Sequence, residues 1–322
     1  MTLTSDTAPI TSPDEGANTA PVEASSKKSA PEGIRSVLIL VNPASGGVAN
    51  NAAAEVEVIL AEYDIEAEVV TLEGAKIPSQ IDEAIAAKPD VLFVLAGDGT
   101  ARSVASKAGP DGPLIGPLPG GTMNMLPKAL YGTGDWKVAL RRALDEGVAQ
   151  PVAGGEVDGE AFYCAAIFGS PALWAPAREA MRDGKVKLAL MYAKRAFKRA
   201  FSGRIRFVLD DGERQKAEAL VLISPMISAA MTEATGLEAA VMKTSRTGEA
   251  VRLAAHALFS DWRHDPNVET QSTRKVAIAA RAKIPAVIDG EPANLGKDAK
   301  VRFLPKAFMA LAPKDAGQDA SA

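Results

Sequence analysis

Three short glycine-rich segments carry the residues of this chain that are best suited to hold a phosphate group. They run from Asn42 to Gly47, from Gly97 to Thr100 and from Pro119 to Asn124. Each follows a short apolar run and precedes a helical pattern, so its glycines let backbone N–H groups close around an anion at a helix N-terminus. The first segment alone is typical of an ordinary strand-to-helix turn. The three together predict a phosphate site at one edge of a sheet.

Acidic residues accompany two parts of this pattern. Asp98 stands between two glycines, where its carboxylate is available to a ligand but equally suits a helix N-cap. Asp289, Gly290 and Glu291 lie far along the chain, and the Asp-Gly pair by itself indicates a hairpin turn. Phosphoryl transfer to a weakly acidic hydroxyl needs backbone donors, Mg²⁺ and one well-placed carboxylate that acts as a base. The loops and acids together suit that chemistry.

Other phosphate and nucleophile motifs are absent from the sequence. It contains no G-x-x-x-x-G-K-[ST] and no G-x-S-x-G segment, and residues 97–102 lack the final glycine of G-x-G-x-x-G. A P-loop NTPase and a dinucleotide dehydrogenase are therefore disfavoured. A single cysteine, Cys164, excludes a disulfide within the chain and a multi-cysteine zinc site, whereas oxygen-ligated Mg²⁺ stays compatible with the composition.

The elements that must position these loops alternate between apolar runs and helical patterns from Ser36 onward. Strands are expected over 36–41, 67–71, 91–95 and 113–116, and helices over 51–63, 77–87, 123–130 and 136–146. Two of the strand runs are apolar throughout, as in strands buried on both faces. We predict a doubly wound, three-layer α/β domain over 34–149, with the loops at the carboxyl ends of its strands.

Beyond residue 147 the pattern changes to strands separated by Asp-Gly turns, which indicate hairpins. Strands are expected over 155–158, 161–166, 205–209, 217–223, 239–243, 275–280, 285–288 and 301–304, with helices over 176–201 and 249–259. We predict an antiparallel β-sandwich domain over 150–313, whose last strand is able to pack back on the first domain. Residues 1–33 and 314–322 are small and polar, and we expect them to be tails. The site is expected in the cleft between the two domains.

Taken in order, these motifs resemble the diacylglycerol kinase catalytic family of bacterial lipid kinases, which includes sphingosine kinases and lies near the NAD kinases. The resemblance extends over about 36–313 and depends on four segments: Asn42 to Gly46, Gly97 to Thr100, Gly121 to Asn124 and Asp289 to Glu291. It implies an ATP site between an α/β domain and a β-sandwich domain. It also implies magnesium-assisted transfer of the γ-phosphoryl group to a lipid hydroxyl, of diacylglycerol or a related lipid.

The resemblance assigns roles to individual residues. Asp289 and Glu291 match the family's acidic pair, which takes the proton from the acceptor hydroxyl, and the choice between them stays open. Asp98 joins them as the acid of the second glycine-rich loop. The residues that would hold the nucleotide are Asn42, Pro43, Ala44, Ser45, Gly46, Thr71, Ala96, Gly97, Asp98, Gly99, Thr100, Gly121, Thr122 and Asn124. No residue is assigned as a metal ligand.

Three segments depart from the family pattern, and the mildest departure is Ala96, which replaces the first glycine of the usual Gly-Gly-Asp-Gly-Thr. The family's Asp-Gly-Leu segment, which supplies a structural magnesium ligand, is Thr235, Gly236 and Leu237 here, and residues 163–166 lack the usual asparagine. These departures keep open a nucleotide-binding or lipid-binding regulator without turnover. An NAD kinase is the other alternative, although the Asn-Glu pair typical of NAD kinases does not occur in the sequence.

A basic segment bears on the lipid substrate. From Arg178 to Arg206, ten Lys and Arg residues accompany two acidic ones, in a chain whose net charge is −4. An amphipathic helix there is able to dock on anionic headgroups, but a solvated helix packed on the sandwich explains the pattern at least as well. The acidic balance and low aromatic content argue against nucleic-acid binding. We expect a cytoplasmic protein, with peripheral contact at the inner membrane surface left open.

Overall fold

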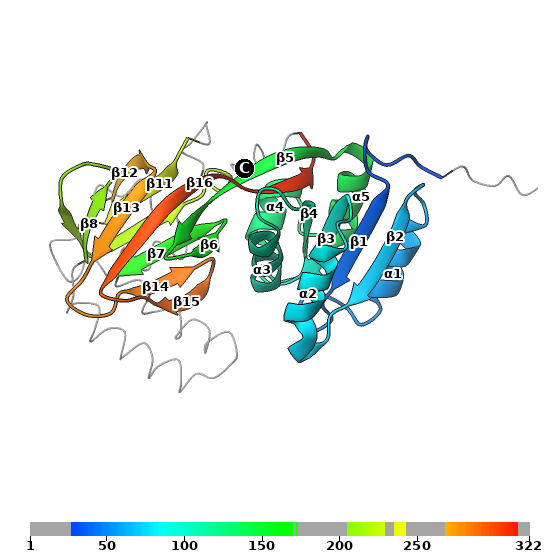
Figure 1. Ribbon diagram of the computed structural model, residues 1–322, viewed down its shortest axis with the longest axis horizontal. Helices are drawn as coiled ribbons and strands as arrows, with labels where there is room; N and C mark the ends of the chain where they lie inside the picture. The colour runs from blue at the N-terminus through cyan, green and yellow to red at the C-terminus, as the bar shows by residue number, and fades with distance from the viewer. Residues whose placement is uncertain (1–26, 170–171, 173–204, 229–234, 243–267, 315–322) are drawn as a thin grey trace, which may run out of the picture.

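The computed structural model describes residues 27–169, 172, 205–228, 235–242 and 268–314, and Figure 1 draws the others as a grey trace. Within these ranges, no helix has both the length and the apolar character that crossing a membrane requires. The helices predicted over 176–201 and 249–259, and most of the basic segment from Arg178 to Arg206, lie outside the described residues.

Parallel strands form the sheet of the N-terminal half. They are β1 (Ser36–Val41), β2 (Glu66–Thr71), β3 (Val91–Ala96) and β4 (Leu114–Pro119), and they lie in the order β2, β1, β3, β4. Every side chain of β3 is buried, because this strand is apolar throughout and lies inside the sheet. All four strands therefore end at the same edge, and each predicted loop of the site follows one of them.

Helices connect these strands. They are α1 (Ala52–Leu60), α2 (Ile77–Ala86, preceded by the short helix η1, Gly74–Lys76), α3 (Asp98–Ala108), α4 (Met125–Tyr131) and α5 (Trp136–Glu146). Helix α2 packs beside α3, whereas α5 packs beside α1 and α4. The predicted helix over 136–146 is confirmed, and Asp135 caps it by accepting a hydrogen bond from the Lys137 N–H at 2.8 Å.

The C-terminal half consists mainly of antiparallel strands. They are β5 (Val148–Val157), β6 (Glu160–Phe162), β7 (Ala165–Gly169), β8 (Ile205–Leu209), β9 (Gln215–Ala217), β10 (Ala219–Ile223), β11 (Leu237–Met242), β12 (Val268–Thr273), β13 (Lys275–Ala279), β14 (Pro285–Ile288), β15 (Glu291–Asn294) and β16 (Asp298–Ala312). One sheet has the order β12, β11, β10, β7, β14, β15, and an apolar core that includes Phe168, Phe207 and Leu220 lies between it and the other sheet. This arrangement confirms the predicted fold class, an α/β part followed by antiparallel β-structure.

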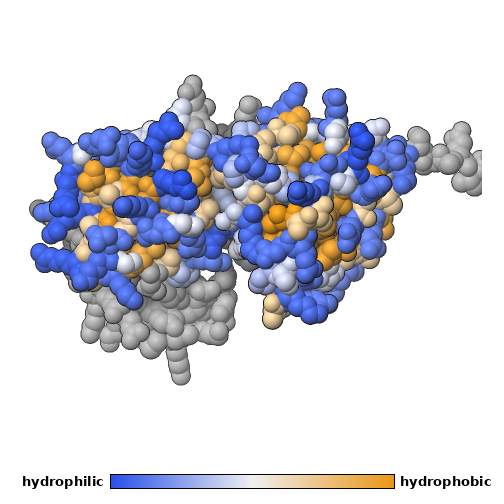
Figure 2. Space-filling view, in the orientation of Figure 1, coloured by the Kyte–Doolittle hydropathy of each residue, from blue (hydrophilic) through white to orange (hydrophobic). Residues whose placement is uncertain are grey.

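Two long strands connect the halves. β16 pairs in antiparallel fashion with β13 and β5, and its far end lies parallel to β4 with Ala310 opposite Ile115. The described strands therefore form a ten-stranded sheet that continues through both halves, and Figure 1 shows β5 and β16 crossing between them. In the face shown in Figure 2, hydrophilic residues surround the apolar patches of both lobes.

Several predicted strands differ from the observed ones. The predicted strand over 161–166 is two strands, because the N–H groups of Tyr163 and Cys164 between them are hydrogen-bonded to Asp289 instead of to a neighbouring strand. The predicted strand over 301–304 lies in the first half of β16, whose pairing with β5 shifts register between Leu304 and Phe308. Strands β12 and β15 were not predicted, and the segment predicted as one strand over 217–223 is divided between β9 and β10.

Candidate functional site

The three glycine-rich loops lie against one another at the carboxyl edge of the parallel sheet. The Gly97 N–H donates to Ser45 Oγ at 3.0 Å, which joins the loops after β3 and β1. The Gly47 N–H donates to the Gly120 carbonyl oxygen at 3.0 Å, which joins the loops after β1 and β4. The sequence predicted that these loops would meet at one edge, and these bonds describe how they do so.

Close packing explains why the third loop contains glycine. A Cβ atom on Gly121 would lie 2.9 Å from the Gly97 Cα, and one on Gly120 would lie 2.8 Å from the Ala96 backbone nitrogen. Real Cβ atoms do not approach backbone atoms so closely, so a side chain at either position would push the loops apart.

Asn124 holds the third loop together. Its backbone is left-handed, with φ 51°, so helix α4 begins at Met125 rather than at residue 123 as predicted. Its Oδ1 accepts the Gly121 N–H at 2.7 Å, and its Nδ2 donates to the Gly121 carbonyl oxygen at 2.9 Å. Its backbone N–H donates to Asp98 Oδ2 at 3.1 Å. Asn124 is thus a link between the third loop and the acid of the second.

Asp98 is the first residue of α3. The preceding Gly97 provides no side-chain cap, so the first N–H groups of this eleven-residue helix lack the side-chain acceptor that usually satisfies them. Asp98 Oδ1 has no hydrogen-bond partner among the described residues. Uncapped N–H groups and an available carboxylate oxygen are suited to a phosphate group with an associated cation.

The remaining predicted binding residues have different environments. Asn42 is buried and accepts the Ala44 N–H at 3.1 Å through Oδ1, which shapes the first loop, whereas Ala44 itself is exposed. Thr71 ends β2 opposite Val41, and its carbonyl oxygen accepts a hydrogen bond from Gln80. Of three further predicted residues, Gly46 and Thr122 are exposed and Pro43 is half-buried.

Asp289 and Glu291 belong to the hairpin between β14 and β15. Asp289 and Gly290 have φ angles of 46° and 86°, as a two-residue turn with both central residues left-handed requires. The Asp289 carboxylate accepts three backbone N–H groups, from Tyr163 at 2.8 Å, Cys164 at 2.9 Å and Ala165 at 3.0 Å. Burial raises the pKa of Asp289, against the opposing effect of these three donors and of the Arg102 charge. These three bonds hold the backbone between β6 and β7 against the Asp289 carboxylate.

Glu291 lies against the N-terminal half. Its Oε2 accepts a hydrogen bond from Arg102 Nη2 at 2.9 Å, and a Cβ atom on Gly99 would lie 2.5 Å from its Oε1. Its side chain is 58% exposed, whereas Asp289 is half-buried, so the Glu291 carboxylate is the more open of the two to solvent. The late hairpin therefore places one accessible carboxylate against Gly99 in the first turn of α3, the residue that follows Asp98.

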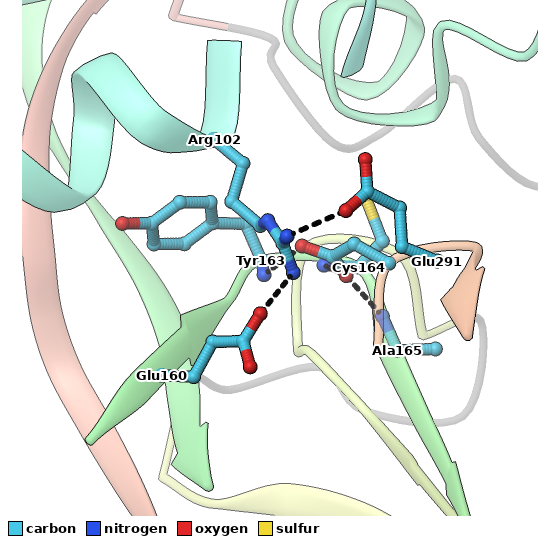
Figure 3. Close-up of polar contacts among 7 residues, drawn as sticks. Arg102, Glu160, Tyr163, Cys164, Ala165 and Glu291 are labelled. Carbon is cyan, nitrogen blue, oxygen red and sulfur yellow. Dashed lines mark hydrogen bonds and ion pairs between the residues drawn. The ribbon is translucent and has the colours of Figure 1, made fainter. Parts of the chain in front are cut away.

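Arg102 and Glu160 complete the contact, and sequence reasoning missed both. Arg102 Nη1 lies 3.1 Å from Glu160 Oε1, while Nη2 bonds Glu291 (Figure 3). The one available signal was the spacing of Arg102, which follows Asp98 by four residues and so shares its face of the helix. Nothing in the sequence indicated which acids it would meet, since they lie 58 and 189 positions further along.

Metal-binding groups are sparse. Across the residues that the structure describes, no three His, Cys, Asp or Glu side chains are grouped so as to hold a metal ion. Thr235, where the resemblance led us to look for an acid, is exposed two positions before β11, and a Cβ atom on Gly236 would meet Ser272 and Thr273.

Comparisons with known proteins identify similar sequences and folds. Residues 36–157 match the family model described as the diacylglycerol kinase catalytic domain. A solved structure of a putative diacylglycerol kinase from Bacillus anthracis str. Sterne has a TM-score of 0.66 at 16% identity, covering 88% of this chain and 99% of that one. Another diacylglycerol kinase structure from the same organism has a TM-score of 0.63 at 14% identity, with the same coverage. At such identities the likeness establishes the fold.

Two further comparisons add little. An NAD kinase from Archaeoglobus fulgidus in complex with ATP has a TM-score of 0.49 at 11% identity, covering 88% of this chain and 96% of that one. A search of curated proteins gives no match to the chain.

Proposed function

We propose that the protein is an ATP-dependent lipid kinase, because residues 36–157 match the family model described as the diacylglycerol kinase catalytic domain. It transfers the γ-phosphoryl group of ATP to the hydroxyl group of diacylglycerol or a related lipid. The observation that carries this proposal is the position of Glu291, an accessible carboxylate from the C-terminal half that lies against Gly99 in the first turn of α3, the residue that follows Asp98.

The glycine-rich loops are suited to the phosphates of the nucleotide. The uncapped N-terminus of α3 offers backbone N–H donors at residues 98–100, and the loop from Asn42 to Gly46 lies beside it through the bond between Ser45 and Gly97. The loop from Gly121 to Asn124 lies on the other side of the α3 N-terminus, because β3 is between β1 and β4 in the sheet. The proposed nucleotide contacts also include Thr71 and Ala96, which end β2 and β3, and Thr122, which lies in the loop between β4 and α4.

Magnesium fits this arrangement only as a companion of the nucleotide. Mg²⁺ usually keeps several waters and binds one or two carboxylates together with substrate phosphates, and the described residues provide no larger group of ligands. Asp98 is the residue that would hold it, through the oxygen that Asn124 leaves free. When bound, the ion would neutralise negative charge on the phosphates.

The acceptor hydroxyl must lose its proton as its oxygen bonds to the γ-phosphorus and the bond to the β-phosphate oxygen breaks. We assign proton removal to Glu291 Oε1, because Oε2 is bound to Arg102 and the carboxylate is exposed. Asp289 is assigned a positioning role, since its oxygens already accept three backbone N–H groups. The sequence left this choice open, and the difference in engagement favours Glu291.

The experiment is a comparison of acceptors with γ-labelled ATP. Purified protein is incubated with diacylglycerol, with a sphingoid base and with NAD, the lipids being presented in detergent micelles. We expect label in the lipid fraction, and roughly 10²–10⁴-fold slower labelling by a Glu291→Gln variant whose fold is checked by circular dichroism. Label in NAD alone would replace this proposal by an NAD kinase. Nucleotide binding without transfer to any acceptor would identify a regulator.

A further inference from the structure

Arg102 lies between two carboxylates that come from the other half of the molecule. It belongs to α3 and follows Asp98 by one helical turn, whereas Glu160 is in β6 and Glu291 is in β15. Its Nη2 is 2.9 Å from Glu291 Oε2 and its Nη1 is 3.1 Å from Glu160 Oε1. Figure 3 shows the guanidinium group between the two acids.

The environment of Arg102 differs from that of an ordinary surface arginine. Its side chain is 15% exposed, although both glutamates are more than half exposed. A largely buried guanidinium is costly unless carboxylates compensate its charge, and Glu160 and Glu291 do so here. Its charge also opposes the rise in the pKa of Asp289, so three acids lie within its electrostatic reach.

The two contacts differ in kind. The Nη2 contact with Glu291 is a hydrogen bond, whereas Nη1 is buried and lies beside Glu160 without the alignment of a hydrogen bond. The hydrogen bond therefore fixes how the Glu291 carboxylate is oriented relative to the guanidinium, whereas Glu160 attracts the guanidinium through its charge alone. Because the guanidinium is planar and rigid, the attraction of Glu160 for Nη1 also orients Nη2 toward Glu291.

The consequence concerns the orientation of Glu291. An exposed glutamate samples many rotamers, and reaction rates fall steeply when a reacting group is misplaced. The bond to Oε2 removes this freedom and directs Oε1 toward Gly99 and the start of α3. The same bond ties the hairpin of the C-terminal half to the helix that bears Asp98.

We propose that Arg102 is a positioning residue for phosphoryl transfer, which orients Glu291 through Nη2 while Glu160 holds its guanidinium in place. This inference rests on the proposed function, because it gives Arg102 its role through Glu291. The role requires that removal of Arg102 lower the rate of transfer without weakening ATP binding, and that this effect disappear when Glu291 is already absent.

The experiment is a double-mutant cycle on phosphoryl transfer to the lipid. Arg102→Gln should lower kcat by about 100-fold, the scale expected for a misplaced reacting group, with the KM for ATP within about twofold of wild type. In a Glu291→Gln background the same change should lower kcat by less than about twofold. Arg102→Lys should restore part of the rate, and Glu160→Gln should cause a smaller loss than Arg102→Gln. The matched control is Lys107→Gln. Lys107 is in α3, like Arg102, and pairs with Asp82 of α2, so its replacement should leave kcat unchanged.

The outcomes distinguish a failure of the proposed role of Arg102 from a failure of the proposed lipid kinase function. A wild-type protein that labels no lipid would overturn the proposed function, and with it the role of Arg102. An active wild type in which Arg102→Gln is harmless, or lowers kcat equally with and without Glu291, would overturn the inference alone. If Arg102→Gln does not fold, Glu160→Gln and Arg102→Lys provide the same cycle with Glu291→Gln.

Discussion

Asp289 and Glu291 stand two positions apart and yet meet different surroundings. The turn that separates them directs Asp289 toward the backbone between β6 and β7, while Glu291 reaches across to α3. From residue type alone, both carboxylates were equal candidates for the general base. The difference arises from what each oxygen already binds, which is a property of the folded chain.

The first prediction concerns Asp289→Asn. An amide has one acceptor oxygen and presents N–H donors where three backbone N–H groups now meet the carboxylate, so donors would face donors. We expect the free energy of unfolding to fall by about 1–3 kcal/mol. Urea unfolding followed by circular dichroism checks this, with Asp111→Asn as the matched control that should unfold like wild type, because the Asp111 side chain is 91% exposed. Equal stability of wild type and Asp289→Asn would contradict the assigned role.

A pH dependence follows from the same residue. Burial raises the pKa of Asp289 in the folded state above its ordinary value of 3.8, so the folded state binds this proton more tightly than the unfolded state does. The resulting stabilisation is complete below pH 3.8 and is lost as the pH rises through the folded-state pKa. Urea unfolding of wild type and Asp289→Asn between pH 3 and 7 should show the advantage of wild type shrinking as pH increases. An advantage that grows with pH would mean that the pKa is lowered instead.

At the scale of the elements, the site depends on loops that follow β1, β3 and β4 and on the residue that links two of them. Asn124 holds Gly121 of its own loop through both groups of its side-chain amide, and its backbone N–H joins this loop to Asp98. Its left-handed backbone also ends the loop and allows α4 to begin. Asn124 is therefore needed both for the conformation of the third loop and for the contact of this loop with Asp98.

The third prediction is that Asn124→Ala weakens nucleotide binding. The change removes two side-chain hydrogen bonds and places alanine in a left-handed conformation, which together should lower the free energy of unfolding by about 1–3 kcal/mol. The freed loop should bind ATP more weakly, as measured by calorimetry. Asn51→Ala is the control, since the Asn51 side chain makes no capping bond at α1. ATP affinity that is unchanged in Asn124→Ala would exclude this loop from the nucleotide site.

The elements of the N-terminal half were predictable because each has a local pattern. The helix over 136–146 matches α5 at both ends, since Asp135 and Gly147 mark them in the sequence. The split between β6 and β7 was not predictable, because the acid that takes their N–H groups lies more than 120 positions away. The full length of β16 was hidden by Pro305, which has no N–H to pair and lies in the register shift. The roles of the predicted site residues stay predictions, as their assignment needs a bound ligand or a measured rate.

At the scale of the whole molecule, strands β5 and β16 and the side chain of Arg102 connect the two halves. The strands form a continuous sheet, and Arg102 adds a contact at the carboxyl edge where the loops lie. Glycine-rich loops from one half and an acid from the other thus lie at one place. In the proposed reaction, the substrates must contact both halves together.

The fourth prediction concerns approach to a membrane surface. The ten basic residues from Arg178 to Arg206 carry positive charge in a chain whose net charge is −4. If they attract anionic headgroups, the protein should co-sediment with phosphatidylglycerol vesicles and not with phosphatidylcholine vesicles. Binding should decline as salt rises, since the screening length shortens from about 10 Å at 0.1 M to about 3 Å at 1 M. Binding that is indifferent to salt and to lipid charge would exclude this attraction.

The most direct test of the central claim is the rate at which the wild-type protein and the Glu291→Gln variant move labelled phosphate from ATP to diacylglycerol. With the carboxylate gone, general-base assistance is lost, and we predict a rate lower by roughly 10²–10⁴-fold with ATP affinity unchanged. A variant as fast as the wild type would show that the carboxylate beside α3 takes no part in the reaction.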